Sequence, residues 1–411
     1  MIEARYIVET PLNPEKVAAI MAGEQSCGTF TRVEGETDAL RERAGAKVLS
    51  VRNMGGCPPS LHSAWLARKG HRGASNRAEV VIGFPEANVG ANLATLAATV
   101  AGNLFDLGEV TGLRLEDMRL PDAYRRRFPL PSHGVAGTRA VTGVAHGPLI
   151  GSIIKPNVGL SAQEIGDLAA RLCASGLDFI KDDEIAANPD HAPIDARIRA
   201  VMAAVRAHRD RTGKHVMVAF NITDETDAMR RHADLIEAEG GSCAMVSLNW
   251  CGFSAVETLR RHTGLAIHGH RNGYGAFSRH PALGIGFGAY QVLWRLAGVD
   301  HMHVHGLGGK FAQEDAEVIA SARACLTPLA KADDRVMPAF SSGQWAGTVP
   351  QTHAAAGSDL LFMAGGGIMA HPGGPAAGVA SIRDAWDAVL RGETLDAAPS
   401  APLAAALDFF G

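Results

Sequence analysis

Short blocks of apolar residues alternate with polar ones along roughly the first 120 residues, and their period changes from block to block. Runs of apolar and β-branched residues are typical of strands, whereas small and apolar residues at helical spacing are typical of helices. The predicted strands are 4–10, 47–53, 77–84 and 113–121, and the predicted helices are 14–23 and 88–105. Their order, β-α-β-β-α-β, predicts a ferredoxin-like α+β domain over residues 1–125.

A stretch rich in proline and glycine, from Pro121 to Pro148, is predicted to connect this domain to a second one. From Leu149 onward, short apolar runs alternate with amphipathic helical stretches. The candidate strands are 149–154, 177–181, 215–221, 243–248, 264–269, 300–305, 335–341 and 358–364. This number of β-α repeats over roughly 260 residues predicts a (β/α)₈ barrel for residues 126–411. A doubly wound open sheet is the alternative, but no GxGxxG follows the first of these strands.

Polar and glycine residues gather where the predicted barrel strands end. In a barrel these ends surround one mouth, where such folds place their active sites. The strand-end residues are Lys155, Lys181 with Asp183 and Glu184, Asn221, Asn249, His270 with Arg271, His303, Ser341 with Ser342, and Gly365–Gly367. Polar or glycine endings on every predicted strand indicate an assembled active site.

The densest cluster of charge is the run DFIKDDE at 178–184. Alternation along a strand places Lys181 and Asp183 on one face and Asp182 on the other. Burying such charges is costly unless they meet partners or a metal. Asp183 and Glu184 carry the hard oxygen ligands that Mg²⁺ prefers, so the run predicts a magnesium site. A solvated polar loop is the simpler alternative.

The other strand ends suggest complementary roles. Lys155 is a candidate general base, and Arg271 is a candidate for binding an anion with both guanidinium arms. Gly365–Gly367 before a helix offers backbone N–H groups to a phosphate, although a tight turn is a comparable explanation. His301, His303 and His305 alternate along one predicted strand and therefore share a face. A three-histidine transition-metal site is therefore an alternative to the hypothesis we favour, one substrate-contacting histidine with structural neighbours.

Composition and charge exclude several classes of function. The formal net charge of −4 gives no reason to expect binding to nucleic acid or to an anionic membrane. No apolar stretch approaches the roughly 20 residues needed to span a bilayer, and the start MIEARYIVETP lacks the pattern of a signal peptide. The six cysteines are scattered without a CxxC pair, so we expect reduced thiols in a cytoplasmic protein.

Several of these segments together resemble the large chain of ribulose bisphosphate carboxylase, RuBisCO. In the predicted barrel they are SIIKPNVGLS (152–161), GLDFIKDDE (176–184), HGHR (268–271), HMHVHGLGGK (301–310) and AGGGIMAHPGG (364–374). In the N-terminal part they are GEQSCGTF (23–30) and AGNLFDLGEVTGLRLEDMRLP (101–121). The resemblance spans nearly the whole chain, and KPNVGL with KDDE at this spacing is a highly specific signal.

The resemblance implies a Mg²⁺ site formed by a carbamylated Lys181 with Asp183 and Glu184. It implies that Lys155 is the base that forms an enediolate. The other implied catalytic residues are His270 and the mobile-loop lysine, Lys310. The implied substrate- and phosphate-binding residues are Arg271, His303, Ser341, Gly366 and Gly367, with Glu24, Thr29 and Asn103 supplied by the neighbouring subunit. A site shared in this way implies an obligate homodimer.

Departures from the family pattern imply a RuBisCO-like protein that does not fix CO₂. Asn157 replaces the second lysine of the KPK motif, Phe30 replaces a tryptophan, and Tyr274 stands where a histidine is expected. HGLGG (305–309) and SSGQWAG (341–347) also differ from the family's segments.

Pro156 and Lys310 are absent from the pattern of the methionine-salvage enolases, and their presence favours the branch that acts on 3-oxo-isoapionate 4-phosphate. Decarboxylation of that sugar phosphate is our leading hypothesis. The alternatives are a transcarboxylase/hydrolase on the same substrate, an enolase or isomerase on another ketose phosphate, and a non-catalytic sugar-phosphate-binding homologue.

Overall fold

The computed structural model describes residues 1–27, 33–330 and 333–411, which form two compact units. The first unit consists mainly of Met1–Leu130 with Gly273–Ala297. The second consists mainly of Pro131–Asn272, Gly298–Pro328 and the chain from 333 onward. The single boundary near residue 125 stays a prediction. In the sequence, the stretch 273–297 lies between two strands of the second unit, but it belongs to the first unit.

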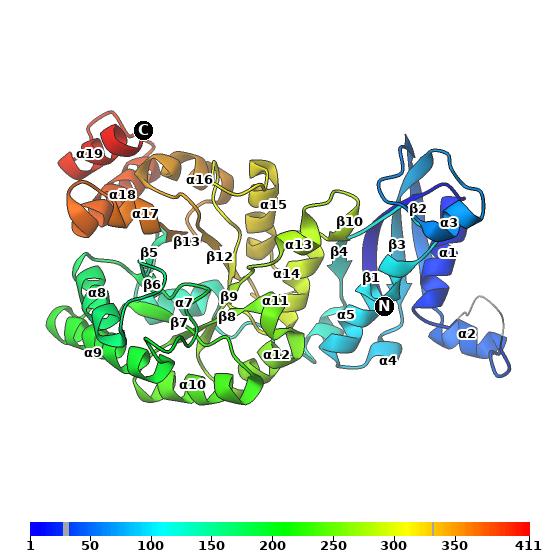
Figure 1. Cartoon of the computed structure of the whole chain (residues 1–411), viewed down its shortest axis with the longest axis horizontal. Helices are drawn as coiled ribbons and strands as arrows, with labels where there is room; N and C mark the ends of the chain where they lie inside the picture. The colour runs from blue at the N-terminus through cyan, green and yellow to red at the C-terminus, as the bar shows by residue number, and fades with distance from the viewer. Residues whose placement is uncertain (28–32, 331–332) are drawn as a thin grey trace. The chain divides into compact units, whose positions relative to one another are not determined.

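The first unit is built on a five-stranded sheet in the order β10-β4-β1-β3-β2 (Figure 1). The strands are β1 (Ile2–Thr10), β2 (Lys47–Cys57), β3 (Ser75–Phe84), β4 (Gly112–Arg119) and β10 (Leu283–Ile285). β1 runs antiparallel to both β3 and β4, and its side chains alternate between buried and partly buried. The helices α1 (Pro14–Glu24) and α5 (Leu93–Ala101) connect β1 to β2 and β3 to β4, which confirms the predicted ferredoxin-like arrangement.

The first unit contains further helices, most of them a single turn or two long. They are α2 (Asp38–Ala44), α3 (Ala64–Arg68), α4 (Glu86–Val89), η1 (Asn103–Asp106), α6 (Asp122–Arg125), α13 (Gly275–Ser278) and α14 (Phe287–Leu296). The predicted helix 88–105 is divided among α4, α5 and η1. Asn92 caps α5 through its side chain, which accepts a hydrogen bond from the backbone N–H of Thr95.

The second unit is a closed barrel of parallel strands in the order β11-β12-β13-β5-β6-β7-β8-β9, which confirms the predicted (β/α)₈ fold. The strands are β5 (Leu149–Ile153), β6 (Phe179–Lys181), β7 (Met217–Asn221), β8 (Cys243–Ser247), β9 (Ala266–His270), β11 (His301–His303), β12 (Met337–Phe340) and β13 (Leu361–Met363). Each lies within a predicted apolar run or ends within one residue of it.

Helices follow the barrel strands in this unit (Figure 1). They are α7 (Gly134–Thr142), α8 (Ala162–Ala174), α9 (Ile194–Thr212), α10 (Thr226–Ala238), α11 (Leu248–Cys251), α12 (Phe253–His262), α15 (Asp315–Leu326), η2 (Ala346–Thr348), α16 (Val349–Ala356), α17 (Gly365–Met369), α18 (Gly374–Leu390) and α19 (Ala401–Phe410). Among the described residues, none of the helices combines the length and apolarity that a membrane crossing requires.

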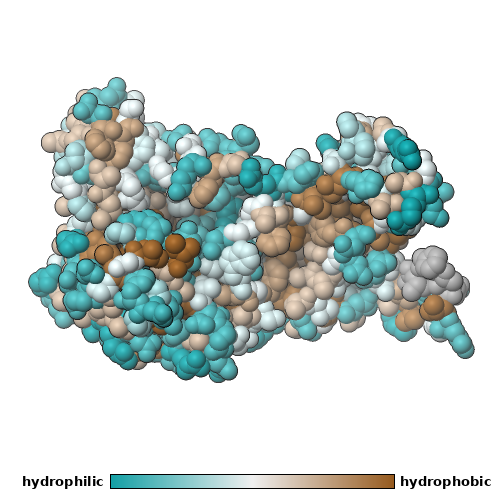
Figure 2. Space-filling model, in the orientation of Figure 1, coloured by the Kyte–Doolittle hydropathy of each residue, from teal (hydrophilic) through white to brown (hydrophobic). Residues whose placement is uncertain are grey.

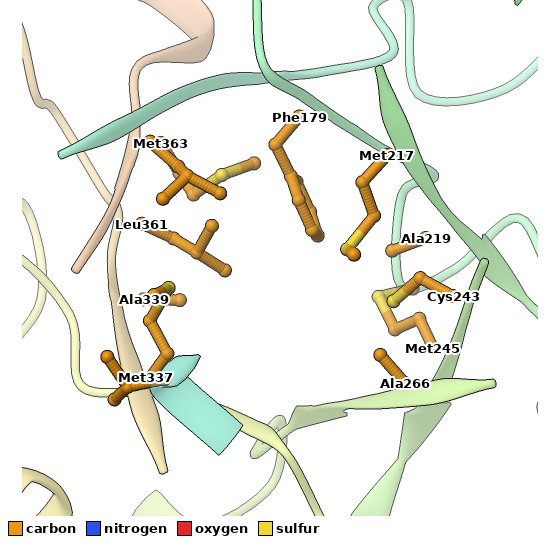
Figure 3. Close-up of a cluster of buried hydrophobic side chains, with 12 residues drawn as sticks. Phe179, Met217, Ala219, Cys243, Met245, Ala266, Met337, Ala339, Leu361 and Met363 are labelled. Atoms are coloured by element: carbon orange, nitrogen blue, oxygen red, sulfur yellow. The ribbon is translucent and has the colours of Figure 1, made fainter. Parts of the chain in front are cut away.

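The barrel interior is filled by side chains from alternate positions of its strands (Figure 3). Met217 and Ala219 on β7 alternate in this way, as do Met337 and Ala339 on β12. Val135 from α7 belongs to the same buried cluster. The interior is therefore a packed core rather than a channel, and the carboxyl ends of the strands meet at one mouth of the barrel.

Candidate active site

Lys181, the last residue of β6, is buried with only 1% of its side chain exposed. Its Nζ lies 2.7 Å from the backbone oxygen of Asp182 and 3.5 Å from Sδ of Met245 in the barrel core. The nearest carboxylate oxygen, Oε2 of Glu184, is also 3.5 Å away. Burial lowers the pKa of Lys181, and the charges of Glu184, Asp183 and Asp182 oppose this shift only in part.

Asp182 points to the other side of the barrel wall. Its Oδ2 accepts hydrogen bonds from Nε of Arg197 at 3.1 Å and from the backbone N–H of Asn221 at 3.0 Å. Arg197, on α9, also donates to the backbone oxygens of Ala187 at 2.5 Å and Ala192 at 2.8 Å. This buried ion pair therefore holds the loop that follows Glu184, and the sequence-predicted alternation of Lys181 and Asp182 is observed.

Lys155 follows β5 and reaches the carboxylate that follows β6. Its Nζ lies 2.8 Å from Oδ2 of Asp183 and 2.7 Å from Oδ1 of Asn157. Asp183 is only 3% exposed, whereas 38% of the Lys155 side chain is exposed. Both partners are hydrogen-bond acceptors, so they fix the amino group while one face of it stays open to the mouth.

A chain of buried histidines crosses the neighbouring strands. Nε2 of His268 lies 2.8 Å from Nε2 of His303, whose Nδ1 lies 3.1 Å from Oγ of Ser341. Deeper in the barrel, His301 contacts His268 (Nδ1 to Nδ1, 3.4 Å) and Oγ1 of Thr138 at 2.7 Å. Burial lowers the pKa of His268 and His303 well below the usual value, and lowers that of His301 to about 4. These rings are therefore neutral at pH 7.

His270 connects this chain to the charged cluster. Its ring centroid lies 4.3 Å from that of His303, and its Nε2 lies 3.5 Å from Oε2 of Glu184. Within the described part of the chain, no three histidine, cysteine, aspartate or glutamate side chains converge as metal ligands. The three-histidine alternative therefore has no support here, whereas Asp183 and Glu184 supply two carboxylates of the kind that a hard divalent cation prefers.

Two further candidates follow other strands, namely Arg271 directly after β9 and Lys310 after β11. Arg271 is buried, and its Nη2 donates to Oε1 of Gln313 at 2.6 Å. Lys310 is exposed, and its Nζ lies 5.4 Å from the ring centroid of Phe311. Among the residues that the structure describes, no contact of Lys310 with Lys155 or Lys181 is found.

Gly366 and Gly367 begin α17, after β13, but only Gly367 is required by the packing. A Cβ on Gly367 would lie 2.5 Å from the backbone oxygen of Gln344 and 2.7 Å from Cβ of Trp345, whereas one on Gly366 would meet nothing within 4 Å. Trp345 in turn packs on Phe410 of α19, with ring centroids 5.5 Å apart. The open backbone at Gly366 is compatible with an approaching anion.

Two of the residues expected from a neighbouring subunit lie together in the first unit. Nδ2 of Asn103 donates to Oε1 of Glu24 at 3.3 Å. The third, Thr29, lies outside the described residues, as does Phe30.

Comparison with known proteins identifies the family. The model of the ribulose bisphosphate carboxylase large chain, catalytic domain, matches residues 134–410, and that of the N-terminal domain matches residues 4–124. The chain belongs to the RuBisCO large chain family. The sequence-based recognition is thereby confirmed.

Similar RuBisCO relatives cover essentially the whole chain. The 3-oxo-isoapionate-4-phosphate transcarboxylase/hydrolase of Xanthobacter autotrophicus is 46% identical, over 100% of this chain and 99% of the relative. The 3-oxo-isoapionate-4-phosphate decarboxylase of Rhizobium etli is 40% identical, over 96% and 95%. A crystal structure of a RuBisCO-like protein from Burkholderia fungorum is 61% identical, with a TM-score of 0.94 and 99% of both chains covered.

The departures from the RuBisCO motifs have clear structural settings. Asn157 holds the amino group of Lys155, as described above. Tyr274 is buried in the first unit, where its hydroxyl donates to the backbone oxygen of Ile285 at 2.9 Å and its ring lies 4.4 Å from that of Tyr290. Tyr274 is therefore accounted for by packing.

Sequence reasoning missed three residues that shape this RuBisCO-like site. Arg197 neutralises Asp182, Gln313 binds the guanidinium of Arg271, and Trp345 supports Gly367. Each of them lies in a helix or loop. A search for polar residues at the ends of the predicted strands therefore could not find them. Only Trp345 had a signal, since it lies in the divergent segment SSGQWAG.

Proposed function

We propose that the protein is a RuBisCO-like enzyme that decarboxylates 3-oxo-isoapionate 4-phosphate and does not fix CO₂. The observation that carries this proposal is the placement of Lys155, whose Nζ lies 2.8 Å from the carboxylate of Asp183. Full-length relatives with 40–46% identity, named for reactions of this sugar phosphate, support the choice of substrate.

The reaction needs a proton at one defined carbon. In a 3-oxo acid the bond between C1 and C2 breaks and CO₂ leaves. The electron pair of that bond stays on C2 and forms an enolate over C2 and C3, which is an enediolate where C2 carries a hydroxyl group. A proton delivered to C2 then gives the product ketone. Lys155, held by Asn157 and Asp183 with one face open, is the proposed donor. The same amino group would act as the base if the enzyme enolised a substrate instead.

Lys181, Asp183 and Glu184 would hold Mg²⁺. The buried amine of Lys181 fits this role. Among the described residues no carboxylate oxygen lies closer to it than 3.5 Å, and its near neighbours include a backbone carbonyl and a thioether. Reaction with CO₂ would convert it to a carbamate, and three anionic oxygen ligands would then converge, which suits a hard divalent cation. When bound, Mg²⁺ would stabilise the negative charge on the enediolate oxygens.

The second candidate is the transcarboxylase/hydrolase reaction, favoured by the identity of 46% to the Xanthobacter enzyme. The two reactions differ in the first one-carbon product, because decarboxylation releases CO₂ whereas hydrolysis of a transferred carboxyl group releases bicarbonate. An enolase or isomerase on another ketose phosphate is a third possibility, and a non-catalytic binding homologue a fourth. The arrangement around Lys155 and Lys181 argues against the binding homologue, since binding alone requires neither group.

Membrane-inlet mass spectrometry of the protein with Mg²⁺, unlabelled bicarbonate and 3-oxo-isoapionate 4-phosphate labelled with ¹³C in the carboxyl group distinguishes these possibilities. We expect labelled CO₂ to appear before labelled bicarbonate, and EDTA to abolish its release. Bicarbonate appearing first would establish the transcarboxylase/hydrolase. No one-carbon product at all would reject both reactions, and an enolisation assay by solvent deuterium exchange would then be decisive.

We also propose a homodimer in which Glu24, Thr29 and Asn103 of one chain complete the other chain's site. Large apolar side chains are exposed just after four barrel strands, namely Val158, Ile185, Trp250 and Phe311. Further ones are exposed along β2, namely Val48, Leu49 and Met54, and hydrophobic residues reach the surface of that unit in Figure 2. Exposed apolar surface of this kind marks association sites.

Mixing two inactive variants tests the shared site. Lys155→Met and Asn103→Leu proteins, each inactive alone, should recover activity when co-expressed, because one site of a mixed dimer contains neither change. A monomeric mass by analytical ultracentrifugation, or no recovery in a demonstrated mixed dimer, would reject the proposal.

A further inference from the structure

Two residues at the barrel mouth have a left-handed backbone although neither is glycine. His305, two residues after β11, has φ of 68°, and Ser342, two residues after β12, has φ of 75°. The two strands pair side by side, with His303 opposite Ala339, so both residues follow the same part of the barrel rim. Residues other than glycine seldom adopt this conformation, and those that do concentrate at ligand sites.

Each of these side chains also has a buried polar atom without a partner. Nδ1 of His305 and Oγ of Ser342 make no hydrogen bond to any residue that the structure describes. Such atoms are costly to leave unsatisfied, so an unexplained one points to a missing partner. The two loops also touch, because a Cβ on Gly309 would lie 3.0 Å from the backbone oxygen of Ser342 and 3.5 Å from its Oγ.

The surroundings of His305 indicate which chemical group would fit. Its ring lies against Phe311, with centroids 4.6 Å apart and planes 31° from parallel. Burial and the positive charge of Arg271 lower the pKa of His305 to about 3, against the opposing hydrogen bond to Gln313. The ring is therefore neutral, with one donor and one acceptor nitrogen. A hydroxyl group can pair with Nδ1 of His305, and equally with the hydroxyl of Ser342.

We propose that His305 and Ser342 form a specificity-determining subsite that binds a hydroxyl group of the phosphorylated sugar acid. The inference rests on the proposed function, which supplies the substrate class, and it names the part of the substrate that these residues recognise. Lys155 and the ligands around Lys181 act on the reacting carbons, whereas this subsite selects a hydroxylated carbon chain.

Isothermal titration calorimetry of Lys155→Met protein, which does not turn over, tests the subsite. His305→Phe keeps a ring against Phe311 and removes both nitrogens, while His305→Asn keeps hydrogen-bonding atoms in a residue type that tolerates positive φ. We expect His305→Phe to raise the Kd for 3-oxo-isoapionate 4-phosphate roughly tenfold or more. His305→Asn should recover much of that loss, and Ser342→Ala should weaken binding by a smaller factor.

Two probes without an alcohol group, inorganic phosphate and 3-phosphonopropionate, are the control, and their Kd should not change in any of these variants. Equal losses for these two probes, or no loss for the sugar acid phosphate, would overturn the subsite. If thermal unfolding shows that His305→Phe does not fold, the Kd of the sugar acid phosphate and the Kd values of the control probes are compared in Ser342→Ala instead.

A separate titration with 6-phosphogluconate distinguishes failure of the subsite from failure of the proposed function. Wild-type protein that releases no CO₂ but binds 6-phosphogluconate, with the same dependence on His305, would reject the reaction and support the subsite. Absence of binding by both sugar acid phosphates would overturn the subsite.

Discussion

Replacing Lys155 by methionine is expected to lower kcat about a thousandfold while leaving binding of inorganic phosphate unchanged. Methionine preserves much of the length of the side chain but removes the amino group that Asp183 and Asn157 hold in place. Positioned acid or base groups typically contribute 10²- to 10⁴-fold to a rate, so nearly all turnover should be lost. Steady-state kinetics of CO₂ release and calorimetry with phosphate measure the two effects.

A matched control for this change is Lys69→Met, in the first unit. Lys69 is exposed and lies 5.6 Å from the ring of Trp65, so its loss should leave kcat within about twofold. Turnover by Lys155→Met close to that of the wild type would show that another group handles the proton. Loss of phosphate binding together with turnover would instead indicate a disturbed site.

Replacing Arg197 by leucine is expected to destabilise the protein by about 3–5 kcal/mol, because it leaves the carboxylate of Asp182 buried without its partner. Arg197 and Asp182 are respectively 1% and 4% exposed, so water cannot replace the lost interaction. The midpoint of thermal unfolding should fall by roughly 5–15 °C. Mg²⁺ affinity should fall as well, because Arg197 holds the loop after Glu184 through the backbone oxygens of Ala187 and Ala192.

Arg199→Leu on the same helix is the control. Arg199 lies 3.8 Å from Glu239 with 57% of its side chain exposed, so the cost should stay below about 1 kcal/mol. Adding Asp182→Asn to Arg197→Leu removes the buried carboxylate that has lost its partner, so the double variant should recover part of the stability. A double variant as unstable as Arg197→Leu alone would assign the loss to the backbone hydrogen bonds of Arg197 instead.

The barrel was predictable from the sequence because each of its strands is a short apolar run that ends at a polar or glycine residue. That local pattern also placed Lys155, Lys181 and Asp183 at one mouth, since parallel strands of a closed barrel share a carboxyl end. Their catalytic and metal-binding roles stay predictions.

Features that depend on distant pairing were not predictable. Arg197 is one of several arginines along α9, and only the folded barrel singles it out as the partner of Asp182. Gln313 has no local signal, because its partner Arg271 lies in another loop. At His305 the sequence suggested a strand face shared with His301 and His303, but β11 ends at His303 and a left-handed turn redirects the side chain.

Strand β10 has a consequence for how the chain is synthesised. It pairs with β4 through Leu283–Ile285, which leave the ribosome roughly 160 residues after β4 is complete. At 5–20 residues per second, β4 would wait on the order of ten seconds or more for its neighbour. During that interval one edge of the N-terminal sheet lacks its final strand, and open edges are prone to pairing with other chains. The nascent N-terminal half is thus most exposed to aggregation while the barrel strands β5 to β9 are being made.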